Sequence, residues 1–135
     1  MHKGQAKVLI IDDDKDFVEA TRLVLASGGY DVAWAGGTEE GMRRLEQEKP
    51  DLLILDMMME GKGAGFVLSR RIRKDARFKS LPILMLTGMR EQTGFSFPGK
   101  DKDSQFLPVD DFAEKPIKPQ DLLARVGKLL EKARA

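Results

Sequence analysis

The sequence predicts an α/β domain with a doubly wound parallel sheet, and three observations support this. Strand-like apolar runs alternate with helix-like stretches along the chain, which is the signature of βαβ units. The run Leu52–Leu55 is continuously apolar, as expected of a strand buried on both faces. Polar residues follow the ends of four such runs, and the ends of parallel strands lie along one edge of a sheet.

Each element has its own signal in the sequence. The strands are expected at Lys7–Ile11, Tyr30–Ala35, Asp51–Leu55, Ile83–Leu86 and Val109–Glu114. Apolar residues at helical spacing predict a helix after each of the first three strands and one at the end of the chain. The helices are expected to begin after Asp14 and Thr38 as N-caps, at about Gly65, and with Pro119 in the first turn.

Length and composition indicate one domain at residues 7–132, preceded by a short tail at residues 1–6. The chain has 135 residues, no cysteine and a net charge of +1, so it lacks a disulfide framework and the basic excess of a general nucleic-acid binder. No apolar stretch approaches the roughly 18 residues of a membrane span. We therefore expect a cytoplasmic protein with no membrane and no direct nucleic-acid partner.

The polar residues at the predicted strand ends form a candidate site. Asp12 and Asp13 follow the first strand, Asp56 the third, Thr87 the fourth and Lys115 the fifth. Carboxylates this close repel each other unless a cation is present, and oxygen ligands suit Mg²⁺. The set fits phosphoryl transfer to Asp56, with the Thr87 hydroxyl and the Lys115 ammonium near the phosphoryl oxygens.

Other readings of single residues remain open. Asp14 fits a helix N-cap as well as it fits the acidic cluster. A threonine after a strand is common, and a lysine ordinarily stays in water, so neither Thr87 nor Lys115 identifies a site alone.

Together, Asp12-Asp13, Asp56, Thr87 and Lys115-Pro116 closely resemble the receiver domain of bacterial two-component response regulators. The resemblance runs from about Lys7 to Leu130 and suggests a single-domain, chemotaxis-regulator-like protein, with a piece of a longer chain as the alternative. It implies a flavodoxin-like fold with five parallel strands in the order 2-1-3-4-5. It also implies a phosphoprotein in a signal-transduction phosphorelay, switched by an aspartyl phosphate.

The resemblance assigns the metal and acceptor roles. Asp56 would be the phosphoacceptor and also a ligand of Mg²⁺ or Mn²⁺. Asp13 would bind the metal directly and Asp12 through water. The backbone carbonyl of Met58 would be a further metal ligand.

The remaining roles concern phosphate binding and switching. Thr87 and Lys115 would bind the phosphoryl group, Thr87 and Phe112 would change position with it, and the bond into Pro116 would be cis. The phosphodonor would be a sensor histidine kinase or a histidine phosphotransfer protein, and the output a downstream protein partner that the sequence does not identify.

Three features depart from the family or stay unassigned. Gly88–Pro108 is long and glycine- and proline-rich, so we expect the fourth helix to be absent or replaced by a long loop. In Met57–Met59, Met59 is expected in the core and the other two at the pocket rim, although a partner surface is an alternative. The basic residues of 70–79 are either a docking patch or, as we favour, a solvated helix end.

The sequence leaves two rival functions open. One is a receiver-like binding module that is never phosphorylated. The other is an aspartate-nucleophile phosphatase of the haloacid-dehalogenase type, which the short chain and the absence of a late acidic pair make unfavourable. The leading interpretation is not an enzyme, beyond Mg²⁺-dependent self-phosphorylation and self-dephosphorylation.

Overall fold

The structure, a computed structural model, describes residues 5–59, 63–88 and 109–134. The strands are β1 (Lys7–Ile11), β2 (Asp31–Ala35), β3 (Leu52–Asp56), β4 (Ile83–Thr87) and β5 (Asp111–Glu114). The helices are α1 (Lys15–Ser27), α2 (Thr38–Glu48), α3 (Ala64–Lys74), the 3-10 turn η1 (Ala76–Phe78) and α5 (Pro119–Arg134).

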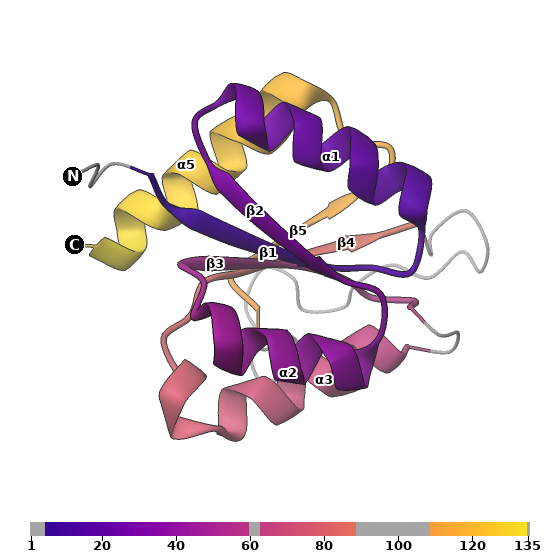
Figure 1. Ribbon diagram of the computed structural model, residues 1–135, viewed down its shortest axis with the longest axis vertical. Helices are drawn as coiled ribbons and strands as arrows, with labels where there is room; N and C mark the ends of the chain where they lie inside the picture. Colours follow the sequence, from indigo (N-terminus) through magenta and orange to yellow (C-terminus); the bar gives the residue numbers. More distant parts are fainter. Residues whose placement is uncertain (1–4, 60–62, 89–108, 135) are drawn as a thin grey trace.

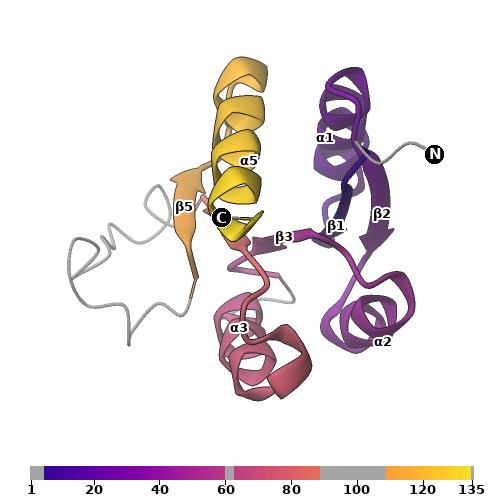
Figure 2. The same cartoon turned by 90° about the vertical axis from the view of Figure 1, so that its left-hand side faces the viewer.

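The strands form one parallel sheet in the order β2-β1-β3-β4-β5, which confirms the predicted flavodoxin-like topology. Helices α1 and α5 cover one face of the sheet, and α2 and α3 cover the other (Figure 1). Turning the molecule by 90° shows the sheet between these two helical layers (Figure 2). The order places β1 and β3 side by side at the centre, so the residues that follow them are neighbours.

Strand β3 shows why the apolar runs are continuous. Leu52 and Ile54 belong to the core under α1 and α5, whereas Leu53 and Leu55 belong to the core under α2 and α3. Neither set reaches solvent, because each side of the strand packs against a helical layer. The rigid sheet therefore fixes the position of Asp56, the last residue of the strand.

Several predicted element ends are confirmed and others are wrong. Asp14 is the N-cap of α1, and its side chain accepts a hydrogen bond from the Phe17 amide at 3.1 Å. Thr38 is not the cap of α2: it is the first helical residue, and Gly37 is the N-cap residue with no side-chain cap bond. Strand β5 begins at Asp111 instead of Val109, which leaves a shorter fifth strand than predicted.

The basic residues of 70–79 are only partly solvated. The Arg73 guanidinium donates to the carbonyls of Phe78 at 3.1 Å and Leu81 at 2.6 Å and pairs with Asp110 at 2.7 Å. The interpretation as a solvated helix end is therefore wrong for Arg73, which ties α3 and η1 to the entrances of β4 and β5.

Two further predictions concern side chains and the long loop. Met59 is buried as expected, but Met57 is also buried in the core instead of lying at a rim. The prediction that a loop replaces the fourth helix falls on residues 89–108, which lie outside the described residues. Within the described part of the chain, no helix has both the length and the apolarity needed to cross a bilayer.

Candidate functional site

Three carboxylates meet at the carboxyl-terminal edge of the sheet. Asp12 directly follows β1 and Asp56 ends β3, and the two strands pair with Ile11 beside Leu55. One carboxylate oxygen each from Asp12, Asp13 and Asp56 lies within 4.8 Å of the others. Asp12 and Asp56 are buried, whereas Asp13 is exposed. The predicted acidic cluster therefore exists, with one carboxylate at the solvent side.

Lys115 reaches into this cluster from the end of β5. Its ammonium lies 3.0 Å from Asp12 Oδ2 and 3.8 Å from Asp56 Oδ1. The backbone amide of Lys115 donates to the Thr87 carbonyl at 2.9 Å, and its peptide bond to Pro116 is cis. The lysine is thus held at its backbone by β4 while its side chain crosses the strand ends.

The surroundings of Asp56 disfavour the ionised form of its carboxyl group. Burial raises the pKa of the Asp56 carboxyl to about 6, and the nearby charge of Asp12 acts in the same direction. The Lys115 ammonium and the Met58 amide, which donates to Asp56 Oδ1 at 3.2 Å, partly oppose this increase in pKa. At neutral pH the side chain is mostly ionised, which a nucleophilic carboxylate requires.

The other predicted site residues occupy different depths of the same edge. Thr87 is buried at the end of β4, where Asp56 pairs with the preceding residue. Met58 is half-buried two residues beyond Asp56. Phe112 lies inside β5, two residues before the strand end, and packs its half-buried ring against the core under α2 and α3. Thr87 and Met58 therefore adjoin the carboxylates, whereas Phe112 lies further back.

The donor set fits a magnesium ion. Three carboxylates with oxygens within 4.8 Å of one another are hard ligands, and one ammonium cannot balance their charge. Asp13 is the exposed member, so an ion could approach from its side with waters still bound. This agrees with the predicted Mg²⁺ site at the acidic cluster.

Two aromatic residues of the site were not predicted. The Lys115 ammonium lies over the Phe17 ring, 4.3 Å from its centroid. The Trp34 indole N–H donates to the backbone carbonyl of Asp12 at 3.0 Å. The sequence pattern placed Phe17 only on the apolar face of a helix, and the hydrogen bond of Trp34 left no signal in the sequence.

Gly65 is a third residue with an unpredicted role. A Cβ atom at this position would overlap the backbone carbonyl of Asp56 and lie 2.9 Å from Met57 Cα. The Gly65 amide also donates to the Met57 carbonyl at 3.0 Å. The first turn of α3 therefore packs directly on the backbone that carries Asp56, which only glycine permits.

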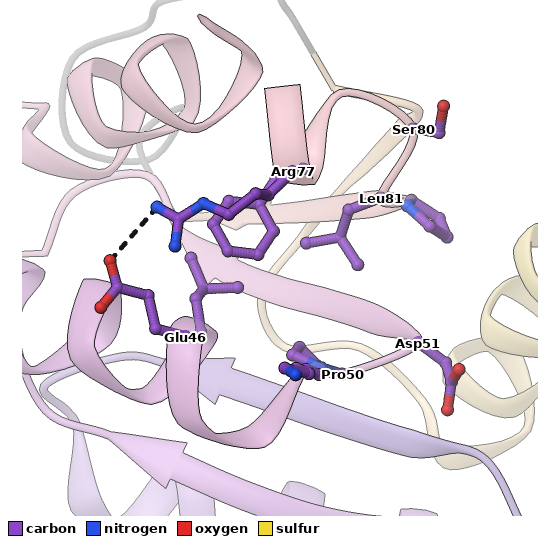
Figure 3. Close-up of a pocket in the computed structure, with 10 residues that line it drawn as sticks. Glu46, Pro50, Asp51, Arg77, Ser80 and Leu81 are labelled. Carbon is purple, nitrogen blue, oxygen red and sulfur yellow. Dashed lines mark hydrogen bonds and ion pairs between the residues drawn. The ribbon is translucent and has the colours of Figure 1, made fainter. Parts of the chain in front are cut away.

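A cavity of about 550 Å³ opens elsewhere, at the start of β3 and β4. None of the predicted site residues lines it. Figure 3 shows Arg77 extended across this cavity toward Glu46, where the two side chains form an ion pair at 3.2 Å. This cavity lies at the opposite sheet edge from the carboxylates, so it is separate from the candidate site.

Comparison with known proteins agrees with the geometry. The family model of the response regulator receiver domain matches residues 8–127. The DNA-binding dual master transcriptional regulator RpaA of Synechocystis sp. is 36% identical over 127 residues, which cover 93% of this chain and 49% of that protein. The phosphate regulon transcriptional regulatory protein PhoB of Pseudomonas aeruginosa is 33% identical over 127 residues, or 93% of this chain and 52% of that protein.

A structural relative gives the same result. The chemotaxis response regulator CheY4 of Vibrio cholerae superposes with a TM-score of 0.78 and 26% identity, covering 93% of this chain and 98% of that one. The chain spans about half the length of the curated relatives described above. The family does not favour either rival function, the unphosphorylated binding module or the haloacid-dehalogenase-type phosphatase. The chain belongs to the response regulator receiver domain family.

Proposed function

We propose that this chain accepts a phosphoryl group on Asp56 from a phosphohistidine and that the phosphorylated form changes its binding to a protein partner. The observation that carries the proposal is the meeting of three carboxylates and the Lys115 ammonium at one sheet edge. Receiver domains are phosphoacceptors and not conventional enzymes, and family membership supports the same role here.

The reaction follows from the positions of these groups. An Asp56 carboxylate oxygen attacks phosphorus, a P–O bond forms, and the P–N bond to the histidine breaks. The imidazole leaves with its bonding electron pair and takes up a proton. Lys115, already 3.8 Å from Asp56 Oδ1, neutralises charge on the phosphoryl oxygens, and the Thr87 hydroxyl is the proposed second donor.

Asp12, Asp13, Asp56 and the Met58 carbonyl are the proposed holders of the divalent ion. A bound Mg²⁺ would supply positive charge to the phosphoryl oxygens and offset the repulsion among the carboxylates. A contact through water suits Asp12, because its two oxygens already pair with the Lys115 ammonium at 3.0 Å and accept from the Asp14 amide at 2.9 Å. The exposed position of Asp13 suits a direct contact.

Phosphorylation by small molecules tests the proposal. Acetyl phosphate with Mg²⁺ should add one phosphoryl group per chain, measured by intact-mass spectrometry, and Asp56→Asn should abolish the addition. Asp51→Asn is the matched control, because Asp51 is exposed at the opposite edge of the sheet. Repeated turnover that survives Asp56→Asn would support a hydrolase instead, whereas no modification of the wild-type chain would support a binding module.

The remaining functional expectations belong to the same proposal. They are self-phosphorylation and self-dephosphorylation, a cytoplasmic location, a sensor histidine kinase or phosphotransfer protein as donor, and Thr87 and Phe112 as switch residues. The names of RpaA and PhoB describe transcriptional regulators, and this chain covers about half of each. We propose a protein partner for this chain because its charge of +1 offers little attraction for nucleic acid.

A further inference from the structure

The ring of Phe17 forms one wall around the Lys115 ammonium. The ammonium lies over the ring at 4.3 Å from its centroid, while Asp12 is 3.0 Å and Asp56 3.8 Å away. The ammonium is therefore enclosed by one aromatic face and two carboxylates, and the Lys115 side chain is only 21% exposed. A lysine surrounded in this way has few other rotamers that keep its charge stabilised.

The position of Phe17 is itself fixed. Its amide donates to the Asp14 cap at 3.1 Å, which holds its backbone in the first turn of α1. Its ring is half-buried against the core under α1 and α5 and lines a groove of about 210 Å³ together with Pro116 and Ile117. The N-cap thus places the ring, and the ring touches the segment that carries Lys115.

We propose that Phe17 is a positioning residue for phosphoryl transfer, holding the Lys115 ammonium at the carboxylate cluster so that it is aimed at the phosphoryl group arriving on Asp56. This inference rests on the proposed function. An aromatic face attracts a cation through its quadrupole but accepts no strong hydrogen bond. The ring therefore retains the ammonium and leaves its N–H donors available to the phosphoryl oxygens. Another carboxylate in this place would compete for those donors.

The ring also suits a movement of the ammonium. The attraction of a ring face for a cation is spread over the face and extends to about 6 Å from the centroid, so it does not hold the ammonium at one point, whereas the contact with Asp12 joins the ammonium to a single oxygen at 3.0 Å. Lys115 can therefore move from Asp12 toward a phosphoryl group on Asp56 while it stays over the same ring.

The test compares Phe17→Leu with Phe17→Tyr. Leucine keeps most of the apolar volume but removes the aromatic face, and tyrosine keeps the face. We expect Phe17→Leu to lower the rate of phosphorylation by acetyl phosphate roughly three- to tenfold, in the range of one cation–π contact, and Phe17→Tyr to restore it. Mg²⁺ affinity, measured by the fluorescence of Trp34, should stay unchanged because the ion meets the carboxylates and not the ring.

A second measurement needs neither metal nor phosphodonor. A ring at 4.3 Å should shift the NMR signals of the Lys115 ε-methylene protons upfield, and this shift should disappear in Phe17→Leu. Val24→Ala is the matched control, because Val24 is also half-buried on α1 and lines the same groove. It should lose stability in urea without losing phosphorylation rate or the upfield shift.

The outcomes separate this inference from the proposed function. A wild-type chain that takes no phosphoryl group would refute the proposed function. A wild-type chain that reacts, with Phe17→Leu reacting equally fast or losing no more than Val24→Ala, would refute the positioning role alone. Failure of Phe17→Tyr to restore the rate would also refute it, because general packing would then explain the loss.

Discussion

Replacing Asp56 with asparagine should make the metal-free protein more stable at neutral pH, although most substitutions of buried residues destabilise. The pKa of Asp56 is raised to about 6, first by burial and then by the charge of Asp12. Its ionised form is therefore unfavourable in the folded protein relative to the unfolded chain. Asparagine is similar in size and has no charge to bury, so the variant avoids this cost.

The magnitude follows from the pKa shift. The pKa rises from 3.8 to about 6, and each pKa unit corresponds to about 1.4 kcal/mol, which gives an upper limit of about 3 kcal/mol. Because the side chain of Asp56 is only 9% exposed, solvent screens little of this effect. We expect a measured gain in the free energy of unfolding of about 1–3 kcal/mol.

The sign of the pH dependence is fixed by linkage. The pKa of Asp56 is higher in the folded protein, so the folded protein binds more protons than the unfolded chain between pH 3.8 and about 6. The stability of the wild type therefore falls as the pH rises through this window. Below pH 3.8 Asp56 is mostly neutral in both states, so wild type and Asp56→Asn should be nearly equal. The advantage of the variant should be complete above about pH 7.

Urea unfolding with a chelator present, followed by Trp34 fluorescence at several pH values, measures this difference. Added Mg²⁺ should then stabilise the wild type by mass action and reduce the advantage of the variant. Asp51→Asn is the control, since Asp51 is exposed at the other sheet edge. A variant no more stable than wild type at neutral pH, or one with the same advantage at pH 4, would falsify the reasoning.

Two further substitutions test the supports of the fold around the site. Gly65→Ala should destabilise the protein by about 1–3 kcal/mol and slow phosphorylation, because the new methyl group meets the rigid backbone of Asp56. Urea titration should show a smaller loss for Gly28→Ala, whose methyl group meets the end of the half-buried Leu123 side chain. Arg73→Met should lower the free energy of unfolding by about 2–3 kcal/mol, because the guanidinium of Arg73 bonds two carbonyls and Asp110. A double-mutant cycle with Asp110→Asn should show a coupling energy of at least about 0.5 kcal/mol. Additive effects of the two substitutions would contradict an ion pair between Arg73 and Asp110.

The meeting of the polar strand ends could be predicted because it depends on topology alone. In a parallel sheet, residues that follow β1, β3, β4 and β5 lie along one edge whatever the side-chain details. Asp12, Asp56 and Lys115 are consequently within reach of one another, as the sequence indicated. The continuous apolar runs also predicted buried strands correctly, since helices cover both faces of the sheet.

Side-chain partners could not be predicted in the same way. Phe17 has the spacing of a core residue, and its contact with Lys115 depends on where the first turn of α1 lies relative to the segment that follows β5. Arg73 belongs to a run of basic residues in the sequence, and only the folded path of η1 brings backbone carbonyls to its guanidinium. Thr38 was misplaced by one residue because a polar residue suits both an N-cap and a first turn.

The electrostatic cost at Asp56 also bears on the switch that we propose for this site. Ionised Asp56 is unfavourable beside Asp12. A cation that binds at this cluster would therefore stabilise the folded protein. Phosphorylation adds negative charge where the Lys115 ammonium is 3.8 Å away and its stronger pairing is with Asp12. We therefore expect the ammonium to shift toward the phosphoryl group. Because the Lys115 amide is bonded to the Thr87 carbonyl, we expect any movement of the Lys115 backbone that accompanies this shift to reach the end of β4.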